Sequence, residues 1–351
     1  MIMEANDNAP TETFRYVDVV DFPHIGQIPA QAALESPYDR LPMALKDSIR
    51  TDLWNLGKNS AGVAVRFRTD SKKLKARWEV LNDFSMNHMT PVGIKGLDLY
   101  TLDNGRWYFV GSARPGLRKG PHESTFISNL DGTMRDYILY MPLYDSAQKV
   151  EIGILDDAVI DQPSNEFPPQ SKPVVVYGTS LTQGGCANRP GMVYTSILSR
   201  WMNREFINLG FSGNGRLDYE IAELMGQSDA GLFILDHLPN CTIDKLDRLP
   251  RFVEILRVNH PNTPILLLGN ARYTYDRFNT VSRGETIAKN NRLVEIYEKL
   301  KQNDPNIYYL PSDELVGEDE EATVDGTHFS DLGFMRMSEN LLPVLQRILG
   351  E

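Results

Sequence analysis

The feature that most constrains the fold is a regular succession of strand and helix patterns in the second half of the chain. Residues 173–177 form a continuous apolar run around Val174, Val175 and Val176, which is typical of a strand buried on both faces of a parallel sheet. Strands are expected at 173–177, 206–209, 232–235, 265–268 and 307–310, and helices at 193–202, 218–225, 243–258, 282–301 and from residue 330 onward. Five strand–helix units in a row predict a doubly wound α/β domain, with helices on both faces of the sheet.

The first half of the chain has a different pattern. From about residue 52 to residue 155 apolar and polar residues alternate, as at Val63, Val65 and Phe67, and a period of two is typical of half-buried antiparallel strands. Strands are expected at 98–102, 106–112, 135–141 and 149–155, with turn residues between them. The sequence therefore predicts an all-β sandwich domain over 1–160, a Pro-rich linker over 161–172 and the α/β domain over 173–351.

The composition excludes several classes of partner. The formal net charge of -11 disfavours nucleic acid and acidic lipid, and no apolar run approaches the ~20 residues that span a bilayer. Residues 1–14 are polar and acidic and show no signal peptide, so a cytoplasmic location is expected unless an export signal was removed. The histidines and cysteines show no zinc-ligand spacing, and neither a metal nor an organic cofactor is expected.

The carboxyl ends of the parallel strands are where ligands of such sheets bind, so the residues after each strand are the candidates for chemistry. Residues 178–185, Gly-Thr-Ser-Leu-Thr-Gln-Gly-Gly, place Ser180 on a tight turn into a helix, near the positive end of that helix. The alternative is a serine that only caps the helix. A nucleotide-binding loop is disfavoured, because the segment lacks the Lys of a P-loop and lacks G-x-G-x-x-G.

Two further strand ends carry polar residues. Residues 210–215, Gly-Phe-Ser-Gly-Asn-Gly, narrowly miss the G-x-S-x-G motif, so Ser212 is not expected to be a nucleophile, and the glycines are expected to let a backbone N–H point into the cleft. After the third strand, Asn240 is either an amide donor in the cleft or a cap of the next helix. His237 precedes it, and a structural role is favoured there over a general base.

The segment before the last helix supplies the base that a nucleophilic serine requires. Asp325 lies three residues ahead of His328 on one short turn, so its carboxylate can reach the imidazole Nδ1 while Nε2 points away. The alternative is a simple turn at the start of the last helix. Each segment alone has such a structural explanation, but the occurrence of all four at this edge of one sheet is much harder to explain by chance.

These four segments resemble the conserved blocks of the SGNH (GDSL) hydrolases, a flavodoxin-like serine esterase superfamily. The resemblance implies that Ser180 is the nucleophile, His328 the base and Asp325 its partner. It also implies an oxyanion hole made by the backbone N–H groups of Ser180 and Gly213 and the side-chain amide of Asn240. No cofactor is implied.

Two departures from the family pattern point to one branch of it. Thr179 stands where the name-giving motif has Asp, and Leu-Pro-Asn at 238–240 replaces the usual G-x-N-D. Both departures resemble a branch in which a β-sandwich precedes the hydrolase. The segments 96–100 (Gly-Leu-Asp-Leu-Tyr) and 87–89 (Asn-His-Met) are similar to the N-terminal domain of that branch, so the resemblance covers nearly the full chain.

The function that this resemblance implies is hydrolysis of short acyl esters, with acetyl esters of carbohydrates as the leading substrate class. A thioesterase or lysophospholipase of the same fold is the nearer alternative. A non-catalytic carbohydrate-binding protein on a hydrolase scaffold is the more distant one, and the presence of Ser180, Asp325 and His328 argues against it. No nucleic-acid partner and no membrane span are expected, and the sequence predicts no particular oligomeric state.

Two spatial expectations follow from the strand order 2-1-3-4-5 of flavodoxin-like sheets and from loop length. Cys186 and Cys241 follow neighbouring strands, and two buried thiols are favoured over a disulfide. The long, weakly charged connection 82–95 is expected to pack against the mouth of the hydrolase cleft near Ser180 and His328 rather than only within its own sandwich.

Overall fold

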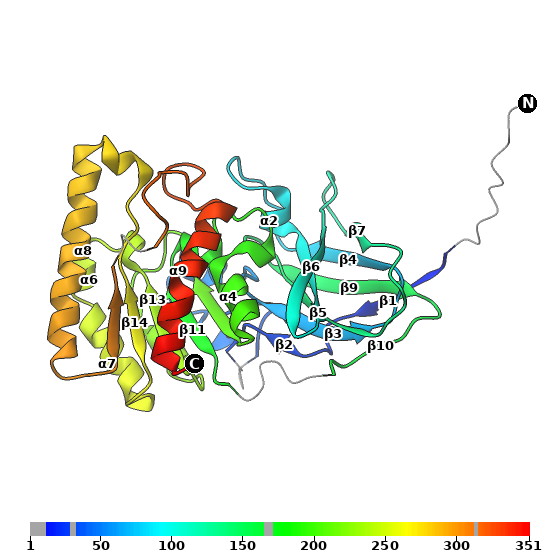
Figure 1. Ribbon diagram of the computed structural model, residues 1–351, viewed down its shortest axis with the longest axis horizontal. Coiled ribbons are helices and arrows are strands. Elements are labelled where there is room, and N and C mark those ends of the chain that lie inside the picture. The colour runs from blue at the N-terminus through cyan, green and yellow to red at the C-terminus, as the bar shows by residue number, and fades with distance from the viewer. Residues whose placement is uncertain (1–11, 29–32, 165–170, 312–314) are drawn as a thin grey trace, which may run out of the picture.

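A computed structural model describes residues 12–28, 33–164, 171–311 and 315–351. Its second half holds a five-stranded parallel sheet of order β12-β11-β13-β14-β15 (Figure 1). The strands are β11 (Val174–Gly178), β12 (Phe206–Gly210), β13 (Leu232–Asp236), β14 (Ile265–Leu268) and β15 (Ile307–Leu310). In chain order this is 2-1-3-4-5, the flavodoxin-like arrangement, and the predicted fold class is confirmed.

Helices cover both faces of this sheet because alternate residues of each strand point to opposite sides. Val174 and Val176 share one core cluster with Phe334, whereas Val175 and Tyr177 share another with Leu256. The helices of this half are α3 (Ser180–Gln183), α4 (Tyr194–Met202), α5 (Tyr219–Met225), α6 (Ile243–Leu246), α7 (Leu249–Asn259), α8 (Thr280–Lys301) and α9 (Asp331–Leu349), with 3₁₀ turns η2 (Pro190–Met192), η3 (Leu238–Asn240) and η4 (Thr274–Arg277). Helices α4 and α9 lie side by side over one face (Figure 1).

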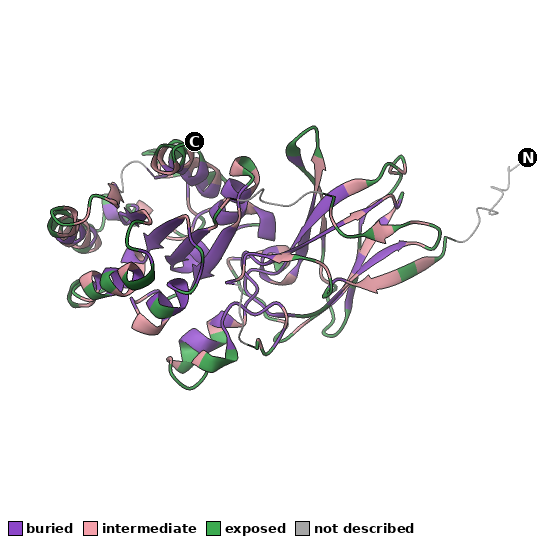
Figure 2. Cartoon of the chain, turned by 90° about the horizontal axis from the view of Figure 1, so that it is seen from below, coloured by how far each residue is buried: buried purple, intermediate pink, exposed green. Residues whose placement is uncertain are grey.

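Two antiparallel sheets form the first half, with the orders β1-β9-β4-β7 and β10-β3-β8-β5-β6, and β2 pairs with β3. Their elements are β1 (Phe14–Asp18), β2 (His24–Ile25), β3 (Ala64–Thr69), β4 (Leu74–Val80), β5 (Leu97–Asp103), β6 (Arg106–Ala113), β7 (His122–Ile127), β8 (Arg135–Tyr140), β9 (Ala147–Leu155) and β10 (Ile160–Asp161), with η1 (Met43–Leu45), α1 (Thr51–Gly57) and α2 (Pro91–Lys95) between strands. Phe67 of one sheet and Trp78 of the other share one core, so the sheets pack face to face as the predicted sandwich. Figure 2 shows that the strands of the parallel sheet are buried, whereas several sandwich strands and the outer sides of several helices are partly exposed.

Several boundaries differ from the sequence predictions. The helix expected at 243–258 is two helices, α6 and α7, because Pro250 lacks a backbone N–H and fits the first turn of a new helix rather than a helix interior. Residues 51–57, placed in the alternating region, form helix α1. The linker expected at 161–172 begins inside β10, which pairs with β3, and its residues 165–170 lie outside the described part of the chain.

The segment between β2 and β3 packs on the parallel sheet. Leu41, Leu53 and Trp54 belong to the core cluster that contains Val175 and Leu256 of the second half. Their side chains are at most 5% exposed. The first half therefore contributes side chains to the apolar core on one face of the parallel sheet, in addition to the separate core of its own sandwich.

In the described residues no helix is both long enough and apolar enough to cross a membrane.

Candidate active site

Ser180 stands at the end of β11, as the first residue of α3. The helix cap is Thr179, whose side-chain oxygen accepts the backbone N–H of Leu181, so Ser180 itself is not the cap that was considered as an alternative. The side chain of Ser180 is therefore available for other contacts. As the first residue of a helix, its backbone N–H has no partner within the helix.

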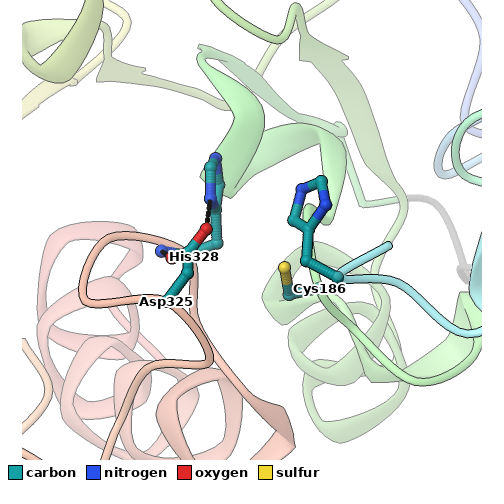
Figure 3. Close-up of side chains that lie close together, drawn as sticks. Cys186, Asp325 and His328 are labelled. Carbon is teal, nitrogen blue, oxygen red and sulfur yellow. Dashed lines mark hydrogen bonds and ion pairs between the residues drawn. The ribbon is translucent and has the colours of Figure 1, made fainter. Parts of the chain in front are cut away.

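Asp325 and His328 lie together on the loop before α9. The backbone N–H groups of Thr327 and His328 donate to Asp325 Oδ1 at 3.0 and 2.8 Å, and the ring Nδ1 of His328 lies 2.7 Å from Asp325 Oδ2. Figure 3 shows this contact as a dashed line. Partial burial would raise the pKa of Asp325, but hydrogen bonds from the backbone and ring of His328 outweigh it and lower the pKa to about 2. The carboxylate is therefore ionised at neutral pH.

The same imidazole reaches the serine from the other side. Nε2 of His328 lies 3.1 Å from Oγ of Ser180, although the two residues are 148 positions apart in the chain. An ionised carboxylate at Nδ1 favours the tautomer that carries its proton there, which leaves the Nε2 lone pair to accept a proton from the hydroxyl. The arrangement can thus activate Ser180 as a nucleophile.

Two groups expected near the serine follow β12 and β13, the strands on either side of β11. Gly213 has φ +67°, a backbone conformation that favours glycine, and nothing lies within 4 Å of the position that a Cβ would take. Asn240 Oδ1 accepts the backbone N–H of Gly215 at 3.2 Å, and in the described residues its Nδ2 has no acceptor. Asn240 does not cap the next helix, because the residue in that position is Thr242.

Ser212 and His237, which the sequence does not favour as nucleophile and base, have other surroundings. Ser212 donates its backbone N–H to Gln183 Oε1 at 2.9 Å, so its loop is held by the turn that follows Ser180. His237 is fully buried, and burial lowers its pKa to about 4, which keeps the ring uncharged. The ring that hydrogen-bonds Ser180 is that of His328.

A buried network behind the serine was not predicted from the sequence. Thr182 donates to Asp236 Oδ2 at 2.7 Å, and the hydroxyl of Tyr194 lies 3.2 Å from the same oxygen. Burial raises the pKa of Asp236 to about 7. Two features of the sequence could have indicated this network: Thr182 lies in the segment just after Ser180, and Asp236 is the last residue of β13. The network ties α3 to the neighbouring strand.

The connection 82–95 packs where it was expected. Met89 and Ile94 belong to the core cluster of Leu181 and Cys186 in the parallel half, and the ring of His88 lies 5.6 Å from that of His328, centroid to centroid. This confirms the predicted contact with the hydrolase half near His328.

Both cysteines of the chain are buried and free, as the favoured alternative predicted. Cys186 lies beside Asp325 and His328 (Figure 3), and together with His88 these side chains form the one group in the described residues whose ligand atoms are close enough to hold a metal ion. Sequence spacing gave no sign of it, because the ligands come from three distant segments.

Both halves of the chain match protein-family models. Residues 171–346 match the GDSL-like lipase/acylhydrolase family, and residues 14–160 match the N-terminus of SGNH-hydrolase-type esterases, named GxDLY. A search of curated proteins finds no significant match.

Solved structures share the architecture of the full chain. A GDSL-like lipase from Bacteroides ovatus is 37% identical, with a TM-score of 0.91 over 96% of this chain and 98% of that one. A salicylyl-acyltransferase from a tetracycline biosynthetic pathway is 19% identical, with a TM-score of 0.75 over 95% and 97% of the two chains. A family two carbohydrate esterase from Cellvibrio japonicus is 14% identical, with a TM-score of 0.62 over 97% and 99%. At such low identity the last two indicate the fold alone.

Proposed function

This chain belongs to the GDSL-like lipase/acylhydrolase family and is an ester hydrolase, and on this premise we propose that it cleaves short-chain acyl esters with Ser180, His328 and Asp325. The observation that carries the proposal is the continuous line of contacts from Asp325 through His328 to Ser180, at 2.7 and 3.1 Å. These are hydrogen-bond distances for a nucleophile, its base and the group that orients the base.

In the proposed acylation step, Ser180 Oγ attacks the ester carbonyl carbon while His328 Nε2 takes the hydroxyl proton. The carbonyl oxygen becomes an oxyanion, and the C–O bond to the alcohol breaks when the intermediate collapses. His328 gives its proton to the departing alcohol oxygen. Water then repeats the sequence on the acyl-serine, with His328 again as base, and the acid product leaves. Asp325 stays ionised throughout and stabilises the imidazolium.

The proposed oxyanion donors are the backbone N–H groups of Ser180 and Gly213 and the side-chain amide of Asn240. The contact from Gly215 N–H to Asn240 Oδ1 supports this role, because it fixes the amide oxygen and leaves Nδ2 to donate. Such donors act where negative charge develops in the transition state and are there before the reaction begins.

For the substrate we propose acetyl esters of carbohydrates. A cavity of about 170 Å³ lies next to the loop of Asp325, and neither Ser180 nor His328 is among the residues that line it. Thr274 lines the cavity and donates its backbone N–H to the backbone carbonyl of Gly326 at 3.0 Å. Its lining is mostly polar and includes Arg272, Glu318, Glu320 and Thr323. Side chains of this kind suit a hydroxyl-rich alcohol better than a fatty acyl chain. The description of a fold neighbour as a carbohydrate esterase supports the same class.

The test is hydrolysis of p-nitrophenyl esters of increasing acyl length, an acetylated sugar, a thioester and a lysophospholipid by the full chain. We expect the highest kcat/KM on acetyl esters. Ser180→Ala should abolish hydrolysis and labelling by a fluorophosphonate, whereas the matched variant Ser212→Ala should keep both. Labelling of Ser212 in place of Ser180 would refute the assignment, and a preference for long acyl chains would favour the lysophospholipase alternative.

A further inference from the structure

Four side chains beside Ser180 form a group that the hydrolytic mechanism only half uses. The mechanism needs Asp325 and His328, but it gives no role to His88 and Cys186. One ligand atom from each of these four residues lies within 4.8 Å of all the others. We call this group the four-ligand cluster.

Hydrogen bonds hold the three chain segments of the cluster to one another. Thr90, two residues after His88, donates through Oγ1 to the backbone carbonyl of Asn188 at 2.5 Å. Asn188, two residues after Cys186, donates through its backbone N–H and its side-chain amide to Asp331, at 2.9 and 3.1 Å. Asp331 begins α9, three residues after His328. The ligand-bearing segments are therefore fixed by direct contacts before any ion binds.

The donor set selects a class of metal ion. Two imidazole nitrogens, one thiolate sulfur and one carboxylate oxygen are ligands of Zn²⁺ and other borderline transition-metal ions, whereas Mg²⁺ and Ca²⁺ take oxygen ligands. A tetrahedral zinc ion with bonds of about 2.0–2.3 Å holds its donor atoms roughly 3.3–3.8 Å apart. The four side chains therefore need to close in only slightly. With neutral histidines, the thiolate and carboxylate also balance the charge of a divalent ion.

We propose that the four-ligand cluster binds Zn²⁺ and that the bound ion blocks ester hydrolysis. The inhibition, though not the binding, rests on the proposed role of His328 as the base. On binding, bonds form from the ion to nitrogen, sulfur and oxygen, and the thiol proton of Cys186 passes to solvent. No electron transfer is involved.

The ion is expected to inhibit hydrolysis whether it binds Nδ1 or Nε2 of His328. If it binds Nδ1, the neutral ring carries its proton on Nε2, which then cannot accept the proton of Ser180. If it binds Nε2, the lone pair that serves as base is occupied. In both cases the carboxylate of Asp325 is also drawn to the ion and no longer fixes the tautomer.

The ion has a route to the cluster. Asp325 is exposed, and His88 and His328 are half-buried, while Cys186 forms the buried side. His88 lies on the connection 82–95 of the sandwich half, and the other three ligands belong to the parallel half. The ion would thus bind across the two halves of the chain.

The binding test uses the full-length Ser180→Ala protein with Co²⁺ as a spectroscopic probe and Zn²⁺ as competitor. We expect one equivalent of Co²⁺ to produce a sulfur-to-cobalt charge-transfer band that stoichiometric Zn²⁺ removes. Adding Cys186→Ala should abolish the band, whereas Cys241→Ala, which removes the other buried thiol, should leave it. A band that depends on Cys241, or no band at all, overturns the proposal whatever the catalytic activity.

The inhibition test uses the proteins that retain Ser180. Zn²⁺ should inhibit hydrolysis of p-nitrophenyl acetate reversibly, with recovery on adding a chelator, and Mg²⁺ and Ca²⁺ should not. His88→Ala and Cys186→Ala should keep basal hydrolysis but need roughly tenfold or more Zn²⁺ for half-inhibition. Equal inhibition in all variants overturns the proposal. A protein that shows the cobalt band but never hydrolyses esters, even without metal, would instead contradict the proposed function.

Discussion

Arg40 donates from Nη1 to the backbone carbonyl of Gly210 at 2.6 Å, so a side chain of the first half of the chain holds the end of a strand in the second. The same guanidinium donates to the carbonyls of Asn59 and Leu56 at 2.6 and 2.7 Å and lies over the ring of Phe211, 4.9 Å from its centroid. Burial lowers the pKa of Arg40 to about 9. This contact anchors the loop that carries Gly213.

Replacing Arg40 by Met is expected to lower the free energy of unfolding by about 3 kcal/mol, because several buried carbonyl oxygens lose their donor together. Urea denaturation of the full chain measures the change. Arg40→Lys keeps a charge but not the planar fork of donors, so its free energy of unfolding should lie between those of Arg40→Met and the original protein. A loss below about 0.5 kcal/mol, the size of an ordinary surface change, would show that water replaces the guanidinium.

Replacing Asp325 by Asn should reduce kcat by up to ~10⁴ without unfolding the protein, because an amide neither fixes the His328 tautomer nor stabilises the imidazolium. Steady-state hydrolysis of p-nitrophenyl acetate is the measurement. His328→Ala should reduce kcat at least as much, whereas His237→Ala should not reduce it to this extent. If His237→Ala abolishes activity and His328→Ala does not, the base has been misassigned.

Asn240→Ala should lower kcat by ~10²–10³ with little change in KM, because an oxyanion donor acts on the transition state rather than on the bound ester. Kinetics and thermal unfolding of the same preparation separate the two roles that the side chain can have. A variant that is less stable but retains kcat would show that the contact with Gly215 is the whole function of Asn240.

The stability of the protein should fall as pH rises through the pKa of Asp236. Burial raises this pKa from 3.8 to about 7, so between these values the folded state holds a proton that the unfolded state has lost. At 1.4 kcal/mol per pH unit, the decrease is at most about 4 kcal/mol. Asp236→Asn should flatten the dependence of Tm on pH between about 4 and 7, the interval between the two pKa values. An unchanged slope in this variant would mean that other groups set the dependence.

The parts of the fold that the sequence predicted are those with a strong local pattern. The apolar run at 174–176 is typical of a doubly buried strand, and the strand–helix units that follow it favour the flavodoxin-like order that the sheet has. Strand β7 was missed because four of its six residues are partly or fully exposed and its apolar residues, Phe126 and Ile127, are adjacent rather than alternating with polar ones. Helix α1 was missed because its helical stretch is only seven residues long.

The candidate site also has a part that could be predicted from the sequence and a part that could not. Ser180, His328 and Asp325 could be predicted because each is a reactive residue type at a strand end or on a short turn, a position that places it at the cleft. The proximity of His88 and Cys186 to His328 could not be predicted, because it depends on how the loop that carries His88 packs on the parallel half of the chain. The buried partners Thr182 and Asp236 likewise become visible only when the strands are assembled.

The docking of α1 on the parallel sheet has a consequence for synthesis of the protein. The chain leaves the ribosome from its N-terminus, so Leu53 and Trp54 emerge long before the apolar side chains of β12 and α5 that belong to the same core cluster. At ~5–20 residues per second, this surface waits on the order of ten seconds for its partner, a period in which chaperones protect such segments. The turn of Asp325 and His328 is made later still. A nascent chain therefore lacks the proposed base of Ser180 until the ribosome has passed residue 328, 148 residues after the serine.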